Sequence, residues 1–150
     1  MSSDNTRTIR YALLIETGLN LSSVVPMLLD PSYMLRWLFK SPEDITPAAC
    51  TLMQWIGCII TSLNLPLLLA VPNKTSAPAL RRSVYMQYAA GEVALGAALA
   101  IQYFGGNSGM RDEALLKFMG SMAASLAVRG FFLLARPDLL EVPNDAKKAQ

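Results

Sequence analysis

The chain has 150 residues, of which 53% are hydrophobic and only 16% are charged, and its formal net charge is +2. A soluble domain carries about 25% charged residues, so this composition is typical of an integral membrane protein. The sequence contains no histidine, which excludes Ser–His and Cys–His nucleophile pairs, histidine-ligated haem and most zinc sites. It also has no basic stripe or aromatic RNA-binding motif, so no nucleic-acid partner is predicted.

Four apolar segments are each long enough to cross the hydrocarbon core of a bilayer, which takes about 20 helical residues. The predicted spans cover residues 10–29, 47–71, 83–104 and 113–135. Thr46 and Pro47 suit the start of the second span, and Arg136-Pro137 suits the end of the fourth. The sequence therefore predicts a single all-α membrane domain over residues 1–150, built as a four-helix bundle.

The segment between the first two spans, PSYMLRWLFKSPED, mixes aromatic and aliphatic side chains with Arg36 and Lys40. This mixture favours a short interfacial helix that lies at the membrane surface, rather than a fifth span. An ordinary loop that carries aromatic residues is the open alternative.

The distribution of lysine and arginine predicts the orientation of the spans. Eight of these residues fall in the N-terminal segment, the loop between the second and third spans, and the C-terminal segment: Arg7, Arg10, Lys74, Arg81, Arg82, Arg136, Lys147 and Lys148. Four fall on the opposite side: Arg36, Lys40, Arg111 and Lys117. The excess of positive charge predicts that both termini are cytosolic, with residues 137–150 as a cytosolic tail.

The last four residues, KKAQ, place lysines at the third and fourth positions from the carboxyl end. This arrangement resembles the dilysine retrieval signal of eukaryotic membrane proteins, which acts on a cytosolic tail. The resemblance implies a multi-pass protein of the endoplasmic reticulum membrane. A solvated basic tail is the alternative interpretation.

Each predicted span carries a stripe of polar side chains at intervals of three or four residues, which places them on one helix face. The stripes are Glu16, Asn20 and Ser23; Gln54, Cys58, Thr61 and Asn64; Tyr85, Tyr88 and Glu92; and Lys117, Ser121, Ser125 and Arg129. At a rise of about 1.5 Å per residue, their inner members lie roughly 9–15 Å from the cytosolic end. Because charged groups are costly in hydrocarbon, the stripes predict a shared polar chamber that opens toward the cytosolic leaflet.

Glu16, Glu92 and Arg129 form the predicted catalytic group. One Glu–Arg pair would balance its own charge, so the second glutamate exceeds what helix pairing requires. Arg129 would keep one carboxylate ionised while the other holds a proton, which supplies a base and an acid in one pocket. The residues predicted to position substrate or water are Asn20, Gln54, Thr61, Asn64, Gln87, Tyr88 and Ser125.

The absence of histidine, of a metal-ligand set and of a cofactor motif leaves reactions that need proton transfer alone, so neither metal nor cofactor is expected. Epoxide opening, cyclisation and double-bond isomerisation of a lipophilic small molecule belong to this class. An epoxide needs an acid at its oxygen and a base that activates water or an internal hydroxyl group. We therefore predict a membrane-embedded acid–base enzyme, most simply an epoxide hydrolase or cyclase.

The number of spans, the chain length and three local stretches resemble the small four-span membrane enzymes of fungal polyketide and terpenoid pathways. The stretches are YALLIETGLN with Glu16, YMQYAAGEVALG with Glu92, and SLAVRGFF with Arg129. That group includes membrane cyclases and epoxide hydrolases that open polyepoxides into cyclic ethers. The resemblance implies secondary metabolite biosynthesis, with these three residues as the catalytic group. The emopamil-binding sterol isomerases share a compact bundle with acidic residues, but they use histidine, which this chain lacks.

Two other functional classes remain open. A structural or binding subunit of a membrane complex would use the same charges to pair its helices with a partner chain. A small proton-coupled carrier would also place glutamate and arginine inside the membrane, although carriers usually show internal repeats and none is convincing here. The expected partners are membrane lipid and a lipophilic substrate, and a homodimer stays open because a second copy of the chain could complete the chamber.

Overall fold

The computed structural model describes residues 3–74, 76–106 and 108–140. Within these ranges all regular elements are helical, apart from an isolated β-bridge between Phe39 and Met110. The long helices are α1 (Ser3–Leu29), α3 (Pro47–Ala70), α4 (Ala77–Gly105) and α5 (Asp112–Gly130), and a π-helical turn, η2 (Phe131–Ala135), continues α5. Four helical segments are long and apolar enough to cross a membrane. The predicted all-α bundle of four spans is confirmed.

The outward faces of the spans carry large apolar side chains that the rest of the protein leaves exposed. Leu19, Ile59, Val93 and Leu134 are each more than half exposed, and each lies on a different span. Such faces are costly in water but match the hydrocarbon core of a bilayer. The chain is therefore a multi-pass membrane protein.

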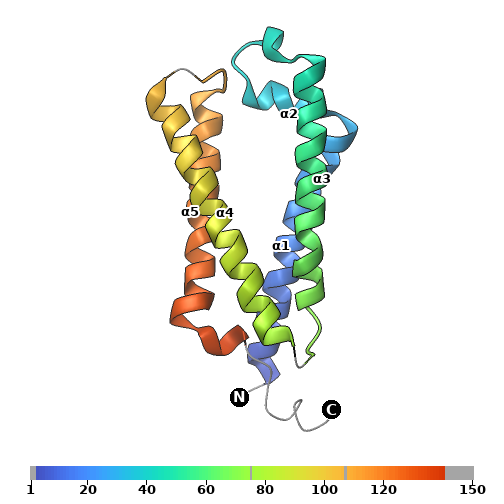
Figure 1. Cartoon of the computed structure of the whole chain (residues 1–150), viewed down its shortest axis with the longest axis vertical. Coiled ribbons are helices and arrows are strands. Elements are labelled where there is room, and N and C mark those ends of the chain that lie inside the picture. Colours follow the sequence, from blue (N-terminus) through green and yellow to red (C-terminus); the bar gives the residue numbers. More distant parts are fainter. Residues whose placement is uncertain (1–2, 75, 107, 141–150) are drawn as a thin grey trace.

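The four spans form two helix pairs, with α1 packed along α3 and α4 packed along α5 (Figure 1). The two pairs lie close together at the end of the molecule where α1 begins and α3 ends, and they diverge toward the opposite end. We refer to these as the terminal end and the loop end. The described chain starts and finishes at the terminal end, because Ile9 near the start of α1 packs in one cluster with Leu139 and Leu140.

Local capping interactions explain where the helices of the loop end begin. The Asp30 carboxylate accepts hydrogen bonds from the Ser32 hydroxyl at 2.7 Å and the Tyr33 backbone N–H at 3.0 Å, which lowers the pKa of Asp30 and starts α2 (Pro31–Leu38). The Thr46 hydroxyl accepts from the Ala49 N–H at 3.2 Å and starts α3, as the sequence predicts. The short helix expected after the first span is therefore present as α2.

Two loops tie the helix pairs together at the loop end. The Lys40 backbone N–H donates to the Gly109 carbonyl at 2.9 Å, and the Arg111 N–H donates to the Leu38 carbonyl at 2.7 Å. The Lys40 ammonium also lies 3.0 Å from the Asp112 carboxylate. These contacts join the segment after α2 to the segment before α5, and they hold the diverging pairs at a set separation. We refer to this structure as the loop junction.

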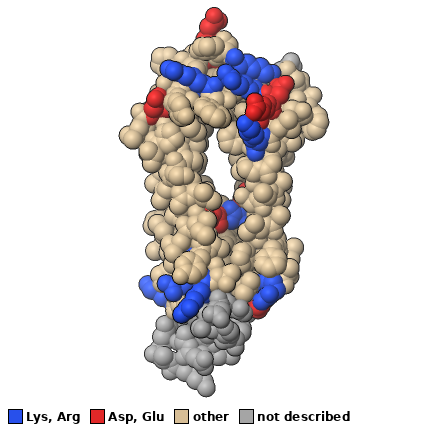
Figure 2. All heavy atoms as spheres, turned by 180° about the vertical axis from the view of Figure 1, so that it is seen from behind, with Lys and Arg blue, Asp and Glu red and all other residues tan. Residues whose placement is uncertain are grey.

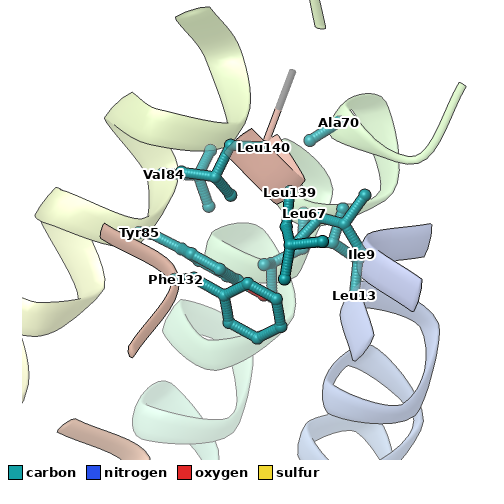
Figure 3. Packing of buried hydrophobic residues seen from close by; sticks show 9 residues of the cluster. All are labelled: Ile9, Leu13, Leu67, Ala70, Val84, Tyr85, Phe132, Leu139 and Leu140. Atoms are coloured by element: carbon teal, nitrogen blue, oxygen red, sulfur yellow. The ribbon is translucent and has the colours of Figure 1, made fainter. Parts of the chain in front are cut away.

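A buried apolar cluster fills the terminal end between the two helix pairs (Figure 3). Side chains from α1, α3, α4, η2 and the 3₁₀ turn η3 (Pro137–Leu140) contribute to it. Its members are Ile9, Leu13, Leu67, Ala70, Val84, Tyr85, Phe132, Leu139 and Leu140. The cluster removes water and lipid from this end of the bundle, and we call it the terminal cluster.

The segment after the fourth span differs from the predicted tail over residues 137–150. Pro137–Leu140 form η3, and Leu139 and Leu140 are buried against the bundle, so the first part of that segment belongs to the fold. Residues 141–150, which include Lys147, Lys148 and the KKAQ stretch, lie outside the described residues.

The third span begins six residues earlier than its predicted start at residue 83, which changes the role of Arg81. The sequence places this arginine in a loop, whereas the structure buries it completely within α4. Its guanidinium donates to the carbonyls of Ala70 at 2.9 Å, Val71 at 3.3 Å and Leu140 at 3.4 Å, and to the side chain of Asn73 at 2.8 Å. Arg81 thus satisfies carbonyl groups that the end of α3 leaves without helical partners.

We expect Arg81→Gln to lower the free energy of unfolding by about 2–4 kcal/mol, because several buried carbonyls lose a charged donor. The matched control is Arg82→Gln, which removes the same charge from an exposed neighbouring side chain. Thermal unfolding of both purified variants in detergent would measure the difference. Equal midpoints for the two variants would show that the Arg81 hydrogen bonds do not stabilise the bundle.

Candidate functional site

A buried ion-pair cluster joins α1, α4 and α5. Arg129 Nε donates to Glu92 Oε2 at 2.9 Å, and Arg129 Nη2 lies 2.8 Å from Glu92 Oε1. The same Nη2 lies 2.6 Å from Glu16 Oε1. One guanidinium therefore bridges two carboxylates on two other helices. The three residues that the sequence singled out as a catalytic group are in direct contact.

The two glutamates differ in how firmly the protein holds them. Both oxygens of Glu92 contact Arg129, and the Glu92 side chain is only 9% exposed. Glu16 uses Oε1 alone for Arg129, and its side chain is 21% exposed. Oε2 of Glu16 accepts no hydrogen bond from the described residues, and no fully buried side-chain oxygen among them lacks a partner. Oε2 of Glu16 is therefore the accessible carboxyl oxygen of the cluster.

The periodicity of α4 explains why Glu92 points into the bundle. Arg81, Tyr85, Tyr88 and Glu92 follow one another at intervals of four, three and four residues, and Leu99 comes seven residues later. Such spacing keeps all five on one stripe of a helix, and four of them are buried. Glu92 therefore lies on the packed face of α4 and not on the face toward lipid.

Two aromatic rings cover the guanidinium of Arg129. Its Cζ lies 4.7 Å from the ring centroid of Tyr88 and 5.4 Å from that of Tyr85, which are distances typical of cation–π contacts. The Tyr88 hydroxyl donates to the Leu63 carbonyl at 2.7 Å and so links α4 to α3. The Tyr85 ring packs on Phe132 within the terminal cluster, with centroids 5.7 Å apart. These rings fix the guanidinium in position and shield its terminal-end side.

A pair of asparagines extends the polar surface from α1 to α3. Asn20 lies one helical turn beyond Glu16, and its Nδ2 donates to Asn64 Oδ1 at 3.2 Å. Asn64 is 1% exposed, and its own Nδ2 donates to the Ile60 carbonyl at 2.7 Å. The two predicted positioning residues are thus in contact with each other, one turn from the ion-pair cluster.

The remaining predicted positioning residues contribute less to the site. Gln54, Thr61 and Gln87 are exposed, and the first two donate to main-chain carbonyls within the spans. Ser125 is half-buried one turn from Arg129, on the same face of α5. Residues three or four apart on a helix lie within a broad sector of its surface and not on a single line. The prediction from sequence therefore included side chains that point away from the cluster.

An opening passes between the two helix pairs, and the buried charges lie near its edge. Figure 2 shows the opening through the loop-end half of the molecule, with acidic and basic side chains at its lower margin. Within the middle parts of the spans, the charged residues are Glu16, Glu92 and Arg129. The sequence predicted a chamber that opens toward the end bearing the termini. The terminal cluster fills that end, so the space adjoining the charges lies on the loop-end side instead.

Comparisons of the chain with protein-family models, curated proteins and solved structures found no match.

The chemistry of the cluster suits proton transfer better than metal binding. No group of three or more histidine, cysteine, aspartate or glutamate side chains suited to a metal ion occurs among the described residues. The two carboxylates that do meet are bridged by a guanidinium, whose positive charge opposes a cation at the same place. The arrangement offers one immobilised carboxylate and one accessible carboxyl oxygen at a lipid-embedded opening.

Two residues that lie beside the cluster, and a third on the same stripe of α4, were not predicted from the sequence to take part in the site. Tyr85 covers Arg129, and Thr17 is buried next to Glu16 with its hydroxyl bonded to the Leu13 carbonyl at 2.8 Å. Arg81 begins the stripe that carries Tyr85 and Glu92. The signal for Tyr85 and Arg81 was their common spacing on α4, whereas nothing in the local sequence distinguishes Thr17.

We expect Arg129→Met to lower the free energy of unfolding by about 3–5 kcal/mol, because two carboxylates would remain buried without a cation. The triple variant Glu16→Gln, Glu92→Gln, Arg129→Met removes all three charges and is expected to recover most of that stability. Thermal unfolding in detergent would measure both.

The matched control for charge is Arg136→Met, since Arg136 is an exposed arginine at the terminal end. Its unfolding midpoint is expected to stay close to that of the unaltered chain. An Arg129→Met protein as stable as this control would contradict a buried, coupled cluster.

Proposed function

We propose that the chain is a membrane-embedded acid–base enzyme that opens epoxides of a lipophilic small molecule, by hydrolysis or with cyclisation. The observation that carries this proposal is the bridging of two inequivalent carboxyl groups by Arg129 beside an opening within the spans. Epoxide opening needs an acid and a base on the same substrate, which this pair provides without a cofactor. The resemblance to small fungal four-span epoxide hydrolases and cyclases supports the same reaction class.

The charge balance of the cluster supports one assignment of the two roles. Two carboxylates and one guanidinium carry a formal charge of −1, and one bound proton brings the total to zero, which is the least costly state in hydrocarbon. Glu92 accepts from Arg129 through both oxygens and is the better-stabilised anion. We therefore place the proton on Oε2 of Glu16, which accepts no hydrogen bond from the described residues.

The proposed reaction uses Glu16 as the acid and Glu92 as the base. The Oε2 proton of Glu16 passes to the epoxide oxygen as a carbon–oxygen bond of the ring breaks. Water, or a hydroxyl group of the substrate itself, attacks the carbon atom of the breaking bond and gives its proton to the Glu92 carboxylate. The product carries a new hydroxyl group and either a second hydroxyl group or a cyclic ether. Transfer of the proton from Glu92 to Glu16 restores the starting state, so atoms and charges balance.

The form of the opening supports a lipophilic substrate. The space beside the charges faces the lipid-exposed sides of the bundle, while the terminal cluster packs between the helix pairs at one end. A substrate dissolved in the membrane would reach Glu16 laterally, without crossing an aqueous surface. The same packing argues against a carrier, which needs access to the site from both sides of the membrane.

The cellular setting is part of this proposal. The excess of lysine and arginine at the terminal end supports cytosolic termini. With that orientation, the KKAQ ending supports retrieval to the endoplasmic reticulum membrane, where a lipophilic secondary metabolite would be processed. A homodimer is compatible with the exposed apolar faces but has no specific support.

Activity measurements on membranes would test the reaction. Microsomes that contain the unaltered chain would be incubated with a panel of lipophilic epoxides and polyepoxides in ¹⁸O-labelled water, and products followed by mass spectrometry. Hydrolysis places label in the product, whereas attack by an internal hydroxyl group does not. We expect Glu16→Gln and Glu92→Gln each to lower turnover by about 10²–10⁴-fold, since each removes one proton-transfer group.

The matched control is Glu113→Gln, which alters an exposed glutamate at the start of α5 and is expected to keep full turnover. The triple variant that removes all three cluster charges serves as a second control, because it should fold and yet be inactive. Product formation that is indifferent to Glu16 and Glu92 would contradict the mechanism. A folded, unaltered chain that turns over no epoxide in the panel would favour a structural subunit.

A further inference from the structure

A second polar cavity lies at the loop end, where α2 meets the start of α5. Its volume is about 380 Å³, which is within the range of about 300–1,000 Å³ found for small-molecule pockets. The walls carry three basic side chains, two aromatic side chains and one carboxylate: Arg36, Arg111, Lys117, Tyr33, Trp37 and Glu113. None of these residues belongs to the ion-pair cluster of the proposed function.

The cavity is held open by the loop junction. Arg111 donates its backbone N–H to the Leu38 carbonyl and its Nε to the Phe39 carbonyl, at 2.7 and 2.8 Å. The antiparallel bridge between Phe39 and Met110 adds to this link. These contacts fix the position of the Arg111 guanidinium relative to α2. The basic groups are therefore arranged before any ligand arrives, which lowers the entropic cost of binding.

The charges in the cavity are incompletely balanced. Lys117 lies 2.6 Å from the Glu113 carboxylate, so these two charges offset each other. The Arg36 guanidinium makes no hydrogen bond or ion pair within the described residues, although the Asp30 carboxylate acts on it electrostatically. Arg111 uses only its Nε for the Phe39 carbonyl. Two guanidinium groups thus present free donors to the same cavity, which favours an anion with several oxygen atoms.

The cavity lies where the bilayer changes from hydrocarbon to headgroups. The first span ends at Leu29 and the fourth begins at Asp112, so the cavity flanks the ends of two spans. Trp37 is 60% exposed and Tyr33 is 51% exposed, and both residue types concentrate at membrane interfaces. Figure 2 shows basic side chains gathered at this end of the molecule. A lipid phosphate is the anion that a bilayer supplies at this depth.

We propose that this cavity binds the phosphate group of an anionic phospholipid. The terminal nitrogens of Arg36 and Arg111 donate to the phosphate oxygens, since guanidinium groups match phosphate geometry. The Lys117 ammonium lies in the same cavity, 5.9 Å from the Trp37 ring centroid, with its charge offset by Glu113. The acyl chains extend along the exposed apolar faces of the spans. Soluble phosphate offers the same chemistry, and the experiment must separate the two sources.

The test uses the two tryptophans of the chain. Trp55→Phe leaves Trp37 as the single fluorescent reporter in the cavity wall. The protein would be placed in nanodiscs of phosphatidylcholine with increasing fractions of phosphatidic acid, and the Trp37 emission recorded. Lipid retention would be measured in parallel by native mass spectrometry. We expect a saturable change in emission and selective retention of the anionic lipid.

The cavity variant is Arg36→Gln with Arg111→Gln, and the matched control is Lys74→Gln with Arg82→Gln, which removes two exposed charges at the terminal end. Each basic residue near a membrane surface is worth about a five-fold change in affinity for an anionic lipid, so the cavity variant should bind roughly 25-fold more weakly. Arg36→Lys keeps the charge and should retain most of the preference. Unfolding midpoints would confirm that each variant is folded.

Three outcomes would overturn the proposal. The first is equal weakening in the cavity variant and its control, which would indicate a general effect of net charge. The second is no preference for phosphatidic acid by the unaltered chain. The third is an equal Trp37 response to inorganic phosphate in neutral detergent, which would assign the cavity to a soluble ligand. The test does not measure epoxide turnover, so the lipid-binding proposal can succeed or fail independently of the proposed enzyme activity.

Discussion

The bundle depends on one guanidinium that must satisfy two carboxylates within the membrane. Charges buried in a medium of low dielectric constant are tolerated only when their partners lie at hydrogen-bonding distance. Arg129 meets this requirement with contacts of 2.6–2.9 Å to Glu16 and Glu92. Because the three side chains come from α1, α4 and α5, these contacts determine how the two helix pairs approach each other. The terminal cluster can then close on one side, and the pairs can diverge on the other.

The same interaction reveals a conflict between stability and chemistry. Arg129 and Glu92 alone would form a neutral, bidentate pair that joins α4 to α5. A leucine in place of Glu16 would avoid the free-energy cost of burying a third charged group in the membrane. The additional carboxyl group brings α1 into the network but adds a buried charge that the single guanidinium does not balance. A buried charge beyond what helix pairing requires lowers stability, and such a cost is tolerated mainly at functional sites.

The spacing of polar residues along each helix and their depth in the membrane predicted the features that can be worked out one helix at a time. The spans, the Thr46 cap and the meeting of Glu16, Glu92 and Arg129 all follow from helical spacing and the cost of charge in hydrocarbon. Arg81 was misplaced because its burial depends on tertiary contacts with the end of α3 and with the Leu140 carbonyl, and the latter is 59 residues away in the chain. The direction of the opening was missed for a related reason, since it depends on how two helix pairs diverge rather than on any one of them.

The two ends of the bundle together limit how the cluster can be reached. Apolar side chains from five elements fill the terminal end, and the loop junction bridges the helix pairs at the other. The opening between these closures runs sideways through the molecule, between the spans and not along them (Figure 2). Under the proposed function, a substrate therefore approaches Oε2 of Glu16 from the lipid. An enzyme of the proposed kind would select its substrates by solubility in lipid before it selects them by shape, so a small bundle with few specific contacts would suffice for a narrow chemical class.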